Sequence, residues 1–457
     1  MQSKERLFKT LKHESVDRIP WVPFAGVHAG FLKDYAADEV LQDADKLYES
    51  LMEVNRLYKP DGQPVVFDLQ LEAECLGCEL QWEKNSPPSI KTHPLDGDDE
   101  EPPVIPCECT IPTPESGRFP VILDVMRRMK ESVGETTALY GLVTGPFTLA
   151  SHLRGNNIFT DMFDFDEETE ELLNYCAKVA KASAGYMIDA GMDVIAVVDP
   201  LISQISSNHF EEYMIKPFTE VFDYIRERGA YSSFFVCGDA TRNLEVMCKT
   251  KPDSMSIDEN VDLKVALEIG RKHGVVVGGN IPLTTVMLNG NQMDNMKFVV
   301  DLLDNMEDKS GFILAPGCDM PYQTPIDNAI GVAQAVIETE SVRQMIKNYV
   351  GEEIDTSGVV IPNYDNLDKP LMEVFTLDPL SCAACTYMLR VAQEAKDTLG
   401  DKIDMAEYRI TEKENIARVK KMEVEKLPSI YINGQLEFSS IIPSKSELEK
   451  ALNIAMK

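Results

Sequence analysis

Short apolar runs recur along the first three quarters of the chain, and stretches with helical periodicity separate most of them. The runs are rich in β-branched and aromatic residues, as buried strands are, and the stretches between them are rich in Ala, Leu and Glu. Strand alternating with helix about eight times over about 340 residues predicts a (β/α)8 TIM barrel. The expected strands are Trp21–Phe24, Pro64–Phe67, Leu139–Thr144, Asp193–Val198, Ser233–Val236, Ser254–Ile257, Val275–Gly278 and Phe312–Ala315. The expected helices include Glu168–Ala190, Phe218–Arg228, Leu263–Lys272 and Met293–Met306.

Residues 71–118 interrupt this rhythm. They contain the pairs Pro87-Pro88 and Pro102-Pro103 and an acidic run at residues 96–101. Proline pairs and dense charge are typical of irregular segments. We therefore expect an insertion over the barrel mouth, within a first domain of residues 1–350.

A second unit follows a polar segment at residues 351–369, which is rich in Gly, Pro, Asn and Asp and is expected to be a linker. Residues 370–457 show strand and helix signals in the order βαβαββα, and Asn433-Gly434 marks a two-residue hairpin turn. This order predicts a small thioredoxin-like α/β domain.

The second unit carries a Cys-x-x-Cys motif where its first strand runs into a helix. A helix N-terminus lowers a thiol pKa, so Cys382 is the expected nucleophile and Cys385 the resolving thiol. Pro428 precedes a strand, where thioredoxin-like proteins place a cis-proline. These residues predict a redox-active domain, and the alternative is a domain that only packs or docks.

Two further cysteines follow apolar runs of the predicted barrel. Cys237 and Cys318 each come directly after such a run, and a TIM barrel carries its chemistry at the carboxyl ends of its strands. Two thiols on one rim can share a soft metal ion. Other residues expected on this rim are Thr144, Gly145, Pro146, Phe147, Asp199, Asp258 and Asn280.

Several short motifs of the barrel occur together in a characteristic order. They are Lys4-Glu-Arg-Leu-Phe8, Asp17-Arg-Ile-Pro20, Gly145-Pro-Phe-Thr148, Cys237-Gly238, Gly279-Asn280 and Ala315-Pro-Gly-Cys318. With these motifs the chain resembles the uroporphyrinogen decarboxylase superfamily over about residues 1–345. Two further motifs are Glu72-Ala-Glu-Cys-Leu-Gly-Cys78 and Pro87-Pro-Ser89. They resemble the corrinoid methyltransferase branch of that superfamily, of which the methylcobamide:coenzyme M methyltransferases are the type example.

The resemblance implies a function. Members of that branch move a methyl group between a corrinoid protein and a thiol, and they bind zinc through a His-x-Cys pair and a later Cys. Cys237 and Cys318 match the two cysteines, but Phe235 stands where the histidine should be. The resemblance thus implies zinc as cofactor, cobalamin or another corrinoid as substrate, a corrinoid protein as partner, and a small thiol or methyl donor. Further metal ligands are sought among Glu72, Asp199 and His28, and Asp199 is also a candidate catalytic acid. The residues implied to shape the substrate pocket are Thr144, Gly145, Pro146, Phe147, Asp258 and Asn280.

Three alternatives stay open at this point. Cys237 and Cys318 can be metal-free pocket thiols, in a thiol-disulfide oxidoreductase or in a corrinoid-docking protein. Uroporphyrinogen decarboxylation needs cations for a polycarboxylate, in particular an arginine after the first strand. The segment Pro23–Phe31 has no arginine there, which disfavours this third alternative.

The composition of the chain limits the kinds of partner that the protein is expected to bind. The chain has 457 residues and a formal net charge of −32, which disfavours binding to nucleic acids and to anionic membrane surfaces. It has no apolar run of about 18 residues and its first residues lack the apolar core of a signal peptide, so a cytoplasmic protein is expected. Ten cysteines in such a protein indicate thiols, metal ligands or a redox pair. No feature of the sequence selects an oligomeric state.

Overall fold

The computed structural model describes residues 1–97, 101–351, 355–377 and 383–456, without the side chains of Ala383 and Lys413. The chain divides into two compact units. Residues 1–202 and 206–349 make the larger unit, and the smaller is made mainly by residues 350–457.

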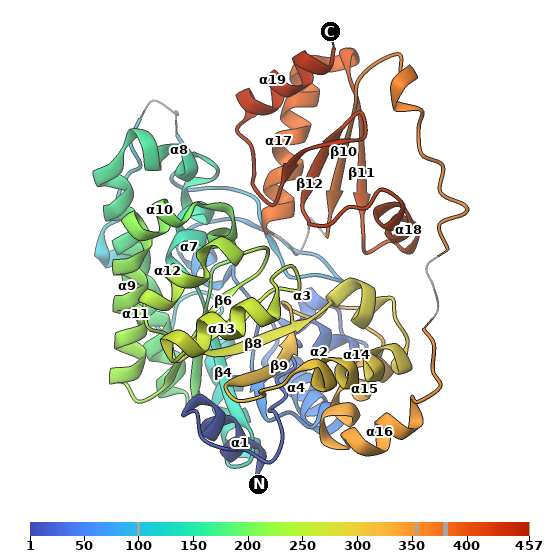
Figure 1. Cartoon of the computed structure of the whole chain (residues 1–457). Helices are drawn as coiled ribbons and strands as arrows, with labels where there is room; N and C mark the ends of the chain where they lie inside the picture. Colours follow the sequence, from blue (N-terminus) through green and yellow to red (C-terminus); the bar gives the residue numbers. More distant parts are fainter. Residues whose placement is uncertain (98–100, 352–354, 378–382, 457) are drawn as a thin grey trace. The chain divides into compact units, whose positions relative to one another are not determined.

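The larger unit is built on seven parallel strands in the order β1-β4-β5-β6-β7-β8-β9, with helices packed outside them (Figure 1). The strands are β1 (Gly62–Pro64), β4 (Ala138–Thr144), β5 (Val194–Val198), β6 (Tyr231–Val236), β7 (Ser254–Ile257), β8 (Val276–Ile281) and β9 (Phe312–Pro316). The helices of eight or more residues are α1 (Ser3–Leu11), α4 (Ala44–Tyr58), α6 (Phe119–Val133), α7 (Pro146–Arg154), α8 (Asn157–Asp164), α9 (Asp166–Asp189), α11 (Ile215–Glu227), α13 (Leu263–His273), α14 (Gln292–Asn305) and α15 (Ile326–Ile337). Shorter helices are α2 (His28–Phe31), α3 (Ala37–Val40), α5 (Leu71–Cys75), α10 (Ser207–His209), α12 (Leu244–Lys249) and α16 (Thr339–Met345).

The segment at Trp21 closes the sheet into a barrel. Trp21 forms a parallel bridge with Leu314 of β9, and its carbonyl accepts a hydrogen bond of 2.9 Å from the backbone N–H of Asp61, next to β1. The expected first strand Trp21–Phe24 is thus reduced to one bridge. With that difference, the predicted TIM barrel is confirmed.

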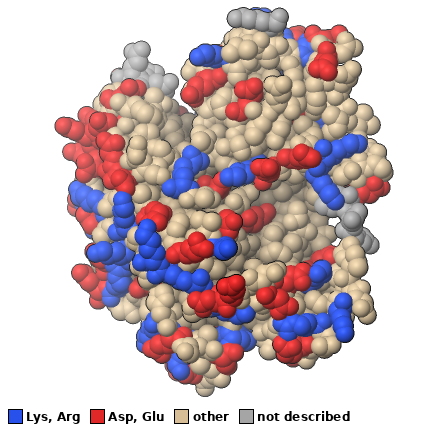
Figure 2. All heavy atoms as spheres, viewed as in Figure 1, with Lys and Arg blue, Asp and Glu red and all other residues tan. Residues whose placement is uncertain are grey.

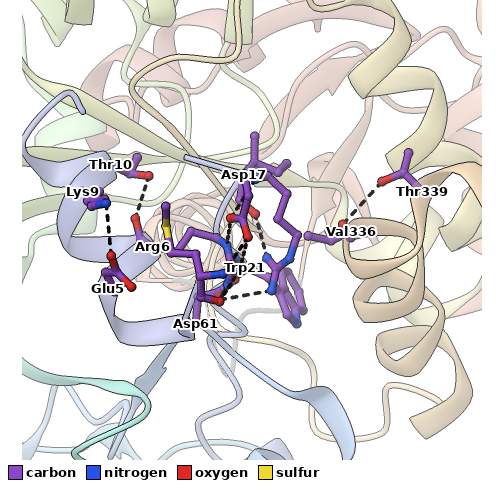
Figure 3. Close-up of polar contacts among 12 residues, drawn as sticks. Glu5, Arg6, Lys9, Thr10, Asp17, Trp21, Asp61, Val336 and Thr339 are labelled. Carbon is purple, nitrogen blue, oxygen red and sulfur yellow. Dashed lines mark hydrogen bonds and ion pairs between the residues drawn. The ribbon is translucent and has the colours of Figure 1, made fainter. Parts of the chain in front are cut away.

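A buried network of ion pairs and hydrogen bonds stabilises this closure. The Asp61 side chain has no exposed surface and accepts hydrogen bonds from Arg6, from Arg18 and from the backbone N–H of Trp21 at 2.6, 2.6 and 2.8 Å. Arg6 also pairs with Asp17, so helix α1 and the closing segment are held by the same charges (Figure 3). Arg6, Asp17 and Arg18 belong to the two motifs nearest the N-terminus.

The barrel interior follows the period of two that strands impose. Alternate residues of β4 and β5 belong to one core cluster with Phe24, Phe235 and Ile313. The strands stay in parallel register, with Tyr140 opposite Val194 and Thr144 opposite Val198. The carboxyl ends of the strands therefore meet at one rim.

The described residues of the insertion at 71–118 contain little regular structure. Besides α5 they form one small hairpin, β2 (Leu80–Gln81) with β3 (Ser89–Ile90), and a 3-10 turn at Glu108–Thr110. Acidic side chains are spread over the visible face of the chain, with basic ones between them (Figure 2). No helix of the described residues is long and apolar enough to span a bilayer.

The smaller unit has a four-stranded sheet in the order β11-β10-β12-β13, with β10 parallel to β11 and antiparallel to β12. The turn residues Asn433 and Gly434 both have positive φ, as a two-residue hairpin turn requires. The expected order βαβαββα, and with it the thioredoxin-like fold, is confirmed. Its elements are β10 (Leu371–Thr376), α17 (Ala383–Leu399), β11 (Asp404–Arg409), α18 (Lys413–Lys421), β12 (Ser429–Ile432), β13 (Gln435–Ser439) and α19 (Lys445–Ala455).

Candidate functional site

Two cysteines meet at the carboxyl rim of the barrel. Cys237 follows β6 and Cys318 follows β9, and the two are joined by a disulfide with a Cα–Cα distance of 5.8 Å. Both are half-buried and pack against the barrel core. The topology thus brings together two thiols that are 81 residues apart in sequence.

Phe235 is a core residue. It has no exposed surface, and its ring lies 4.7 Å from that of Phe24 and 5.6 Å from that of Phe67. The Phe235 side chain has no atom that could bind a metal ion at the rim. The apolar side chain that replaces the expected histidine therefore fills the interior of the barrel.

Acidic residues stand beside the backbone of each cysteine. The Asp258 carboxyl group accepts a hydrogen bond from the backbone N–H of Gly238, next to Cys237. Glu259 accepts one from the backbone N–H of Leu283 and lies against Gly317, next to Cys318. Burial and the neighbouring Asp258 raise the pKa of Glu259 to about 8.

Asp319 is a rim acid that the sequence reasoning missed. Its Oδ1 accepts a hydrogen bond of 2.7 Å from the backbone N–H of Gly26, and burial raises its pKa to about 8. A side chain at Gly26 would lie within 2.7 Å of both carboxylate oxygens. Its place directly after Cys318 was the available signal.

Asp199 holds the start of helix α7. Its carboxylate accepts hydrogen bonds from the backbone N–H of Phe147 and from the N–H and hydroxyl of Thr148, at 2.9, 3.1 and 2.6 Å. These donors lower its pKa, but burial is the larger effect and raises it to about 7. Asp199 thus anchors the turn after β4 and has the geometry of a helix cap.

Glu72 lies against the end of β4. Its Oε2 accepts a hydrogen bond of 2.9 Å from the Thr144 hydroxyl. The side chain has no exposed surface, and burial raises its pKa to about 7. A buried carboxyl group is therefore held next to the rim.

The other expected pocket residues form the wall of the barrel rather than an open surface. Thr144, Pro146 and Phe147 are buried, and the Phe147 ring packs on Phe159 of α8. Asn280 donates hydrogen bonds to the carbonyls of Asp258 and Val261. Gly145 approaches Asp199 so closely that an added Cβ would lie 2.4 Å from the Asp199 Cβ.

Both ring nitrogens of His28 have hydrogen-bond partners within the protein. One ring nitrogen lies 2.9 Å from the Tyr322 carbonyl and the other 2.7 Å from the Tyr58 hydroxyl. Burial lowers its pKa to about 4, so the ring is neutral near pH 7. In this arrangement neither nitrogen is available to a metal ion.

Zinc takes about four ligands in proteins. Reduced Cys237 and Cys318 supply two soft thiolates, which fit the ion, and the remaining positions need a carboxylate, water or a substrate thiol. The described parts of the chain contain no group of three or more His, Cys, Asp or Glu placed to hold a metal. Two thiolates suit zinc chemically, but the described residues do not complete a zinc ligand set around Cys237 and Cys318.

Two of the residues expected at the site of the smaller unit, Cys385 and Pro428, lie in the described part of the chain. The Leu427–Pro428 peptide bond is cis, and the backbone N–H of Leu377 donates a hydrogen bond to the buried Cys385 sulfur. Cys382 lies outside the described residues.

Comparisons with known proteins agree with this architecture. The uroporphyrinogen decarboxylase (URO-D) family model matches residues 2–339, and a thioredoxin domain model matches residues 372–453. The methylcobamide:CoM methyltransferase MtbA of Methanosarcina acetivorans is 28% identical over 71% of this chain and 94% of its own length. The methylcobamide:CoM methyltransferase MtaA of Methanosarcina barkeri is 27% identical over 73% of this chain and 96% of its own. A solved methyltransferase structure from Methanosarcina mazei has the same barrel fold, with a TM-score of 0.66 and 22% identity over 74% of this chain and 99% of that one.

Proposed function

The chain belongs to the uroporphyrinogen decarboxylase (URO-D) family, and from this premise we propose that its barrel transfers a methyl group between a methylated corrinoid and a thiol. The observation that carries the proposal is the meeting of Cys237 and Cys318 at the rim. The relatives named methylcobamide:CoM methyltransferases support it, because this chain covers nearly their whole length.

The site is proposed to work in its reduced form. Two cysteine thiolates would then hold zinc, which on binding lowers the pKa of a substrate thiol so that the thiolate attacks the methyl carbon. Asp199 positions the Thr144–Phe147 turn through the start of α7. The corrinoid is substrate, carried by a partner protein, and Asp258 and Asn280 brace the rim beside Cys237.

Decarboxylation of a polycarboxylate is disfavoured because the segment Pro23–Phe31 has no arginine to bind carboxylates. Gly26 of this segment instead donates a hydrogen bond to the carboxyl group of Asp319.

The test uses the full chain, purified without oxygen, with methylcobalamin as donor and coenzyme M as acceptor. Reduced protein should consume methylcobalamin, seen in its absorbance spectrum, and should contain about one zinc per chain. Cys237→Ala should lose the zinc and about 100-fold of the rate. Cys248→Ala, at a buried cysteine of α12, is the matched control and should keep both. A Cys237→Ala protein with full activity would refute the proposal.

The disulfide itself favours a second candidate, a thiol-disulfide oxidoreductase with a metal-free rim. This candidate expects reduction of insulin disulfides, no methyl transfer and no zinc in the reduced protein.

The C-terminal unit is proposed to keep the rim thiols or the acceptor thiol reduced. Cys382 and Cys385 would pass two electrons and two protons to a disulfide and become a disulfide themselves. Changing both to Ser should lower methyl transfer under mild oxidation and leave it unchanged under strong reductant. Equal activity of the variant and the wild type in both conditions would contradict this role.

A further inference from the structure

A second pair of thiols lies on the surface of the larger unit, in the insertion. Cys107 and Cys109 flank Glu108 in a 3-10 turn, and both cysteines are exposed. The proposed methyl transfer does not use this pair. Its surroundings and geometry suggest a role for it.

Two polar contacts connect this turn to helix α9. The Thr110 hydroxyl donates to the Cys107 carbonyl at 2.7 Å and lies 2.7 Å from the Tyr175 hydroxyl. Glu108 forms an ion pair with Lys178, one turn further along the same helix. The two thiols are therefore presented on a fixed segment.

The two sulfurs are not equivalent. The backbone N–H of Cys109 donates a hydrogen bond of 3.2 Å to the Cys107 sulfur, and the Cys109 thiol donates to the same sulfur. These two donors lower the pKa of Cys107, and the shared proton raises the pKa of Cys109. The backbone hydrogen bond thus makes Cys107 the more acidic thiol of the pair.

Other cysteines of the same unit are less exposed. Burial raises the pKa of Cys75, Cys78 and Cys248 to about 12, so they stay protonated near pH 7. Cys107 and Cys109 differ from them because both are exposed.

We propose that Cys107 and Cys109 form a second redox-active dithiol, which exchanges with a disulfide at the surface of the larger unit. The Cys107 thiolate attacks one sulfur of the incoming disulfide, whose S–S bond breaks and releases one thiolate. Cys109 then gives its proton to solvent and attacks the Cys107 sulfur of the mixed disulfide, which releases the second thiolate. The pair loses two electrons to the incoming disulfide and closes as a Cys107–Cys109 disulfide.

The experiment is a redox titration of the full chain in buffers of reduced and oxidised glutathione. It uses a Cys237→Ala/Cys318→Ala background, and alkylation and peptide mass spectrometry follow each cysteine. We expect the peptide with Cys107 and Cys109 to lose two hydrogens as one cooperative step. In Cys109→Ser, Cys107 should hold a trapped glutathione, formed at least about tenfold faster than the adduct of Cys109 in Cys107→Ser. Circular dichroism checks that both variants fold.

Three results would overturn the proposal. They are equal reaction rates of the two thiols, separate glutathione adducts without ring closure, and a stoichiometric metal on the pair that blocks its oxidation.

A further experiment distinguishes two possible sources of the incoming disulfide. If the Cys382→Ser/Cys385→Ser variant equilibrates the pair about tenfold more slowly at low glutathione, the chain's own C-terminal unit is the exchange partner. An unchanged rate assigns an external disulfide.

Discussion

The carboxyl group of Glu72 should make the stability of the larger unit depend on pH. Burial raises its pKa from the usual value near 4.5 to about 7, because the ionised form is disfavoured inside the folded protein. Folding stability is therefore unaffected by this group below about pH 4.5 and falls as pH rises toward 7. The full loss corresponds to about 3 kcal/mol. Glu72→Gln cannot ionise, so its stability relative to wild type should rise by about 2–3 kcal/mol between pH 5 and pH 8.

Urea unfolding followed by tryptophan fluorescence measures this change in one unit. Trp21 and Trp82 are the two tryptophans of the chain, and both belong to the larger unit. Glu79→Gln, at an exposed side chain of the same insertion, is the control and should show no such pH dependence. A stability difference between Glu72→Gln and wild type that is the same at pH 5 and pH 8 would refute the reasoning.

Three further changes test the packing around the site. Asp61→Ala leaves two arginines without their buried partner and should lower the stability of the larger unit by about 3–5 kcal/mol, measured by the same fluorescence assay. Gly145→Ala places a methyl group 2.4 Å from the Asp199 Cβ, so it should displace the first turn of α7. It should lower methyl transfer about 10- to 100-fold with unchanged circular dichroism. Glu373→Ala removes the buried carboxylate of β10 that pairs with an arginine, and should lower protection from hydrogen exchange in the smaller unit by about 3 kcal/mol.

The sequence predicts a strand well where apolar residues are continuous or alternate with a period of two. Phe312–Ala315 lies within β9, and Ser254–Ile257, in which serines alternate with Met255 and Ile257, coincides with β7. The strand expected at Pro64–Phe67 is instead β1 at Gly62–Pro64. This strand contains Gln63, whose buried side-chain amide hydrogen-bonds the Leu51 carbonyl and the Asn55 side chain of helix α4. Hydrophobicity does not reveal a buried polar side chain whose hydrogen-bond partners lie in a helix.

The same limit applies to the site. The pairing of Cys237 with Cys318 follows from topology, because parallel strands of a barrel end at one rim. The contacts of His28 and Asp319 do not follow from it, because their partners lie 294 and 293 residues away and satisfy individual atoms. Sequence patterns therefore locate the rim, and the hydrogen bonds decide which side chains on it stay available.

The barrel can close only after most of the larger unit has been synthesised. Gly26 meets Asp319 across 293 residues, at the same seam where Trp21 bridges Leu314. At about 5–20 residues per second, a ribosome takes about 15 to 60 seconds to make that intervening chain. Throughout this time the growing sheet has open edges, which are templates for aggregation. The emerging polypeptide is thus expected to depend on chaperones until β9 leaves the exit tunnel.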